Sequence, residues 1–260
     1  MRSLPRFMQP FLTFVTGVPL TGETPAVRWT TLRATLLSIA QVAAGIALGV
    51  LALNPVTPWS AALLLLSWLT TAGGMRRLDV VIVHQTLHHK VAQTRRGNRI
   101  IGELITTVLW RVPFDENRKE HLIHHAYPCS MKDVDTRYLI STGMRGGMTR
   151  AEYNRYLIRA LLSPKHHWGF FSSRIRANFT LQQPAYRLAM SLVFLATTIA
   201  FLAATGLWLE WLLLWVIPVS VFFQAATFLY THTEHRWWLH DHREKLTKEQ
   251  RDRLSDARFC

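Results

Sequence analysis

The chain has 260 residues and a mass of 29.9 kDa, enough for one domain or one membrane bundle with attached soluble parts. Its residues are 49% hydrophobic, yet its formal net charge is +14. A soluble nucleic-acid-binding protein could carry this charge, but its basic residues would not be interrupted by long apolar runs. We therefore expect no nucleic-acid partner.

Four long apolar runs divide the chain, and Arg33 is the one basic residue within them. We expect them to be membrane spans near residues 31–53, 59–75, 188–205 and 207–230. Each is about long enough to cross a hydrocarbon core of roughly 30 Å, the second only with help from its flanks. The sequence predicts an all-α, polytopic membrane protein with about four transmembrane helices in two hairpins. Asn54-Pro55 and Gly206 supply the reversals.

The basic residues are distributed unevenly along the chain. Of the 30 lysines and arginines, four lie at or before Arg33, 19 lie between Arg76 and Arg187, and seven follow Tyr230. Because cytoplasmic loops retain positive charge, both termini and segments 76–187 and 231–260 are expected on the cytoplasmic side. We expect residues 1–260 to form a single domain in a bacterial inner membrane, with a cytoplasmic helical cap.

A shorter apolar segment, Ile100–Trp110, lies inside the central cytoplasmic block. Its eleven residues are too few to cross a bilayer, and it contains Glu103. The segment is therefore expected to form an interfacial or buried helix.

Eight of the twelve histidines form three clusters on the expected cytoplasmic side. If the helices continue into them, His84 and His88 lie one turn apart, and the second cluster leans toward one side of its helix. The bundle would then gather all three clusters at one end. The clusters are His84, His88 and His89; His121, His124 and His125; and His232 and His235.

This many imidazoles suits a pair of iron ions that activates dioxygen, because each ion needs several ligands and open positions. Eight nitrogens would give four to each ion. The carboxylates of Asp133, Asp135 and Glu234 are suited to accept the other ring N–H and fix its orientation, and Glu234 could also be a direct ligand. A haem protein, a zinc hydrolase and a metal transporter fit the pattern less well, because the spans lack histidines and have few polar residues, and zinc needs only three or four ligands.

At these residues the sequence resembles the membrane fatty acid desaturase and hydroxylase superfamily of histidine-box di-iron enzymes. That family has an HxxxH or HxxxxH box after one transmembrane hairpin, an HxxHH box shortly after, and further histidine motifs after a second hairpin. The first box resembles His84…His88-His89. The second resembles Arg118-x-x-His121-x-x-His124-His125, followed by Asp133-Val-Asp135.

The chain departs from the family pattern at its C-terminal end. The final HxxHH box is absent, and His232-Thr-Glu-His235-Arg236 is more similar to the NxxEH element of alkane hydroxylases. Two explanations stay open. Either the chain is truncated, or His240 and His242 supply the missing ligands.

The resemblance implies an oxidoreductase with two iron ions and with dioxygen as co-substrate, acting on the acyl chain of a lipid. The eight clustered histidines would be the metal ligands, with Asp133, Asp135 and Glu234 in auxiliary roles. A separate ferredoxin or cytochrome would supply electrons, because no electron-carrying segment is fused to the chain. The expected function is a fatty acyl desaturase; the alternatives are a lipid or alkane-type hydroxylase or a truncated, non-catalytic relative.

Overall fold

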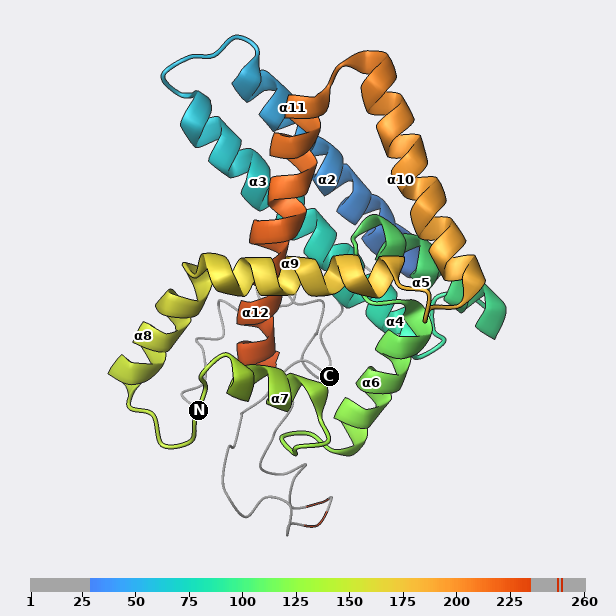
Figure 1. Cartoon of the computed structure of the whole chain (residues 1–260), viewed down its shortest axis with the longest axis vertical. Coiled ribbons are helices and arrows are strands. Elements are labelled where there is room, and N and C mark those ends of the chain that lie inside the picture. The colour runs from blue at the N-terminus through green and yellow to red at the C-terminus, as the bar shows by residue number, and fades with distance from the viewer. Residues whose placement is uncertain (1–28, 235–246, 248, 250–260) are drawn as a thin grey trace, which may run out of the picture.

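The computed structural model describes residues 29–234 together with residues 247 and 249. Every regular element within this part of the chain is a helix, as the sequence predicts (Figure 1). The elements are α2 (Thr31–Leu53), α3 (Ser60–Arg77), η2 (Leu78–Val83), α4 (His84–Leu87), α5 (Arg95–Val108), α6 (Phe114–Ala126), α7 (Val134–Ser141), α8 (Arg150–Leu161), α9 (Pro164–Phe179), α10 (Ala185–Thr205), α11 (Trp208–Trp211), η3 (Leu212–Val216), η4 (Pro218–Phe222) and α12 (Phe223–Glu234).

Three stretches of helix in the described chain are long and apolar enough to cross a membrane: Thr31–Leu53, Ala185–Thr205 and Trp208–Thr233. The second expected span, residues 59–75, corresponds to α3, which is 18 residues long and ends in Arg76 and Arg77. These two charged residues lower its mean hydropathy, and it is not among the three. A membrane protein is confirmed, while the count of four spans stays a prediction.

Helices α2 and α3 pack closely because small residues line their contact. A Cβ atom added to Gly45 would lie 2.6 Å from the backbone nitrogen of Thr71, and one added to Gly74 would lie 2.8 Å from that of Val42. The Ser67 hydroxyl donates a hydrogen bond of 2.7 Å to the Gly45 carbonyl. Such contacts replace the hydrophobic driving force, which is weak between helices in lipid.

Helix α3 continues without a break through the π-helical segment η2 into α4. A π-helical turn accommodates an extra residue and so changes which side of the helix the following residues occupy. The buried Asp79 lies in this turn and accepts hydrogen bonds from Arg76 at 2.5 Å and from Arg111 at 3.1 Å. The turn leads directly into His84.

The second hairpin begins with α10, which ends where the sequence predicts a reversal. Gly206 has a φ of +73°, and its N–H donates to the Leu202 carbonyl at 2.8 Å. A glycine adopts this left-handed conformation without a Cβ penalty. The returning helix changes to π-helix at η3 and again at η4, where Pro218 has no N–H to give to the regular α pattern.

Helix α5 contains most of the apolar segment that is too short to cross the bilayer, and a buried ion pair connects it to α10. The Arg187 side chain is fully buried and donates to Glu103 at 2.8 Å and to Asn178 at 2.5 Å. Buried charges require such partners. Helix α9 crosses the upright helices, while α6, α7 and α8 lie further toward the end opposite the hairpin connections (Figure 1).

Candidate metal centre

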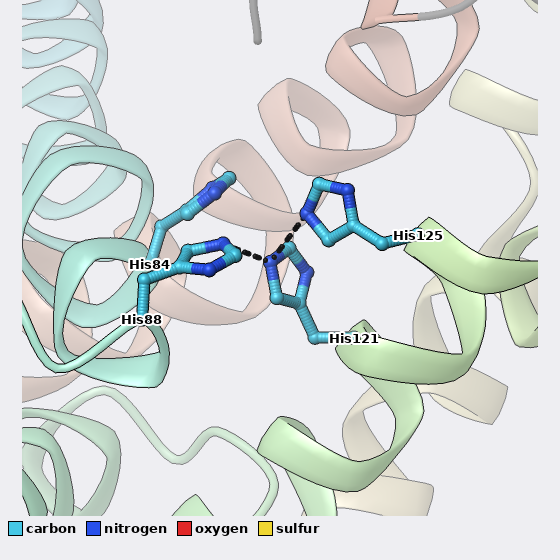
Figure 2. A group of neighbouring side chains, drawn as sticks. All are labelled: His84, His88, His121 and His125. Carbon is cyan, nitrogen blue, oxygen red and sulfur yellow. Dashed lines mark hydrogen bonds between the residues drawn. The ribbon is translucent and has the colours of Figure 1, made fainter. Parts of the chain in front are cut away.

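Four histidines from two separate segments converge at this end of the bundle (Figure 2). Each offers one ring nitrogen, and the four nitrogens lie within 4.8 Å of one another. The Nε2 atom of His121 is 2.9 Å from that of His88 and 3.0 Å from that of His125. We name this the four-histidine group: His84, His88, His121 and His125.

Helical spacing explains how each segment contributes two members. His84 opens α4 and His88 follows its last residue, and their ring centroids are 5.1 Å apart. His121 and His125 lie one turn apart at the end of α6, with ring centroids at 4.4 Å. Residues spaced by four share a helix face, so each pair is presented together.

Burial keeps the imidazoles of this group neutral. Burial, and after it the charges of neighbouring histidines, lower the pKa of His84 to about 4 and that of His121 to about 2. The pKa values of His88 and His125 are also lowered, again first by burial. A neutral imidazole retains the lone pair with which it binds a metal.

The third member of the second cluster faces a different partner. His124 is buried, and its Nδ1 atom lies 3.1 Å from Asp133 Oδ1 and 3.5 Å from Asp135 Oδ2. Burial raises the pKa of Asp133, but hydrogen bonds from His124 and Thr136 outweigh this effect and hold it below its usual value. His124 therefore lies within contact of the two carboxylates proposed to orient a histidine, although that role stays a prediction.

Two further sequence-predicted histidines, His89 and His232, are described and lie outside the four-histidine group. His89 has a φ of +59°, and its buried Nδ1 atom has no hydrogen-bond partner within the described part of the chain. His232 has both ring nitrogens engaged, Nδ1 with the Phe228 carbonyl at 2.7 Å and Nε2 with the Tyr156 hydroxyl at 3.0 Å. Glu234 is the last residue of α12, and its side chain is outside the described part of the chain, as is all of His235.

A cavity of about 1010 Å³ adjoins the centre. It is lined by His84, His121 and His124 together with residues that the sequence interpretation did not single out, including Asp79 and Arg174. One signal for Asp79 was present, because it directly precedes the apolar stretch Val80–Val83, and an ionisable residue beside apolar sequence at a membrane is a functional candidate. Nothing in the local sequence distinguishes Arg174 from the other basic residues of the central block.

The donor set of the four-histidine group fits a metal ion. A metal–nitrogen bond of about 2.1 Å, with neighbouring ligands at right angles, places two nitrogens about 3 Å apart. The His88–His121 and His121–His125 separations have this value. Neutral nitrogen donors suit iron among the first-row metals, and also zinc and copper.

The fold and the site define a class of protein: a helical membrane protein with a histidine-rich candidate metal centre at one end of its bundle. A family model for fatty acid desaturases matches residues 58–258, which is most of the chain. The chain belongs to the fatty acid desaturase family. No curated protein matches the sequence.

Proposed function

We propose that the chain is a membrane-bound, iron-dependent oxidoreductase that uses dioxygen to desaturate the acyl chain of a lipid. The observation that carries this proposal is the four-histidine group, assembled by two sequence segments that are 33 residues apart at His88 and His121. The family membership supports the desaturase-type chemistry and a lipid substrate.

Within this proposal the four-histidine group would hold one iron ion. His124 would belong to the second ion, together with candidates that lie elsewhere or outside the described residues: His89, His232, His235 and Glu234. Bound iron would supply the dioxygen and one-electron chemistry that amino-acid side chains lack. The role of Asp133 and Asp135 would be to accept the His124 ring N–H and so fix the ring.

The electron balance requires a partner. Forming a carbon–carbon double bond releases two hydrogen atoms from the substrate, and reduction of dioxygen to two waters takes four electrons in all. Two of them must therefore come from a separate donor of the ferredoxin or cytochrome type. The net charge of +14 would attract an acidic donor to the cytoplasmic face.

The test is the metal content and the product of detergent-purified protein from iron-replete bacterial membranes. We expect iron in the wild type, its loss in His121→Ala, and its retention in His167→Ala, because His167 lies outside the four-histidine group and contacts the Leu161 carbonyl. With a reductant and dioxygen, the wild type should convert a saturated acyl chain into an alkene. An alcohol as the main product would make the protein a hydroxylase, and metal content indifferent to His121 would contradict the proposal.

A further inference from the structure

The cavity beside the candidate metal centre carries many charged side chains among its apolar ones. Seven cationic and four acidic side chains line it. Apolar residues in the wall, such as Val80, Val83 and Leu87, could pack against an acyl chain, but they do not account for the charged ones. The excess of positive charge instead suits a negatively charged group.

One cationic residue in the wall, Arg174 on α9, has no hydrogen-bond partner for two of its donors among the described residues. Its Nε and Nη1 atoms are both buried and unpaired. The guanidinium lies 4.5 Å from the ring centroid of Phe170, a contact that leaves its N–H donors unused. Buried donors are nearly always paired, so two unpaired N–H groups on one cavity-lining cation indicate a missing acceptor.

The neighbouring arginines Arg76 and Arg111 are held by a carboxylate. Both donate to Asp79, which is thereby occupied. Burial, together with the charge of Arg111, lowers the pKa of Arg174 to about 9. This value still lies above neutral pH, so Arg174 stays protonated and positively charged.

We propose that Arg174 binds the anionic head, a carboxylate or a phosphate, of an amphiphilic acyl substrate inside the cavity that His84, His121 and His124 line. This inference rests on the proposed function and narrows its substrate to acyl compounds with a negative head. Under this proposal a charged head group, and not an uncharged ester group, occupies the cavity that the histidines line.

The experiment measures equilibrium binding to the full-length protein in a neutral detergent, without reductant, so that no turnover is needed. The probes are palmitate, its methyl ester, hexadecyl phosphate and inorganic phosphate. The variants are Arg174→Gln, Arg174→Lys and, as a matched control, Arg176→Gln, an exposed arginine on the same helix that does not line the cavity. All variants are compared at one detergent concentration, so that the partition of each probe into micelles is the same for every variant.

We expect Arg174→Gln to weaken palmitate and hexadecyl phosphate by about tenfold or more, the loss expected for a charge-assisted hydrogen bond. Arg174→Lys should lose less affinity for these two probes, and Arg176→Gln should lose none. The affinity for the methyl ester should be the same in every variant. Equal losses for acid and ester, or no loss for either, would overturn the proposal. Inorganic phosphate binding as tightly as hexadecyl phosphate, through Arg174, would make this a site for free anions instead.

Two further readouts keep the test decisive. The elution profile and the thermal unfolding temperature show whether each variant is folded; Gln at this position removes an unpaired buried charge, so we expect no loss of stability. If Arg174→Gln fails to fold, a wild type that binds palmitate no better than its methyl ester still contradicts the inference. Loss of iron with retained head-group selectivity would instead contradict only the proposed function.

Discussion

His124 and Asp133 form a buried pair in which the ring Nδ1 atom lies 3.1 Å from a carboxylate oxygen. The same carboxylate accepts the backbone N–H groups of Cys129 and Asp135 and the hydroxyl of Thr136. It also caps the N-terminus of α7. One side chain thus fixes both a candidate ligand and the helix that follows it.

The first prediction separates these two roles of Asp133. Asp133→Asn retains an N-cap oxygen but weakens the contact with His124, so we expect iron affinity to fall by about 10- to 100-fold with little loss of stability. Asp133→Ala should also lose the cap and cost about 1 kcal/mol more in the free energy of unfolding. Iron titration and thermal unfolding measure the two effects, and unchanged iron affinity in both variants would contradict an orienting role.

The second prediction concerns how the metal is divided between sites. If the four-histidine group holds one ion and His232 contributes to another, His232→Ala should lower the iron content from about two ions per chain to about one. His121→Ala should remove the ion of the four-histidine group. Tyr156→Phe, which removes only the hydroxyl that contacts His232 Nε2, is the control. Full iron content in His232→Ala would mean that His232 binds no iron and has only a structural role, through its contacts with Tyr156 and Phe228.

The third prediction tests the buried ion pair between α5 and α10. Arg187→Met leaves the buried Glu103 carboxylate without its cationic partner, although the Tyr186 hydroxyl still donates to it, and we expect a loss of about 3–5 kcal/mol in the free energy of unfolding. The double variant with Glu103→Gln should recover much of it. Arg99→Ala breaks the exposed pair with Asp115 and should cost less than about 1 kcal/mol. Equal effects of Arg187→Met and Arg99→Ala in denaturant titrations would refute this ranking.

The fourth prediction tests the packing of α2 against α3. Gly45→Ala places a Cβ atom 2.6 Å from backbone at Thr71, so the helices must separate and the protein should unfold at a lower temperature. Gly169→Ala, on α9, meets nothing within 4 Å and should instead stabilise by about 0.5–1 kcal/mol, because alanine favours helix. A Gly45→Ala variant as stable as the wild type would show that the two helices are not held this closely.

Much of the architecture could be predicted from sequence because hydropathy and helical spacing are local signals. The bounds of α2, the reversal at Gly206 and the pairing of His84 with His88 depend on residues close together in the chain. The second box was expected to lean as a unit. Instead, His121 and His125 face the four-histidine group while His124 faces Asp133.

What could not be predicted depends on contacts between distant segments. Sequence spacing does not show that Arg187 would pair with Glu103, 84 residues away, or that Tyr156 would contact His232. It also does not indicate a π-helical turn before His84, since Leu78–Val83 contains neither proline nor glycine. Such features emerge only when the helices pack together.

If α3 crosses the membrane as predicted, the unbroken run of α3, η2 and α4 would connect the bilayer mechanically to the candidate metal centre. His84 lies on the continuous helix that packs against α2, and His88 directly follows that helix. His121 and His125 belong instead to the separate helix α6. A thicker or thinner bilayer changes the tilt of the helices it surrounds. With no joint between α3 and α4, such a tilt would displace one pair of histidines relative to the other, so the lipid environment itself would adjust the geometry of the centre.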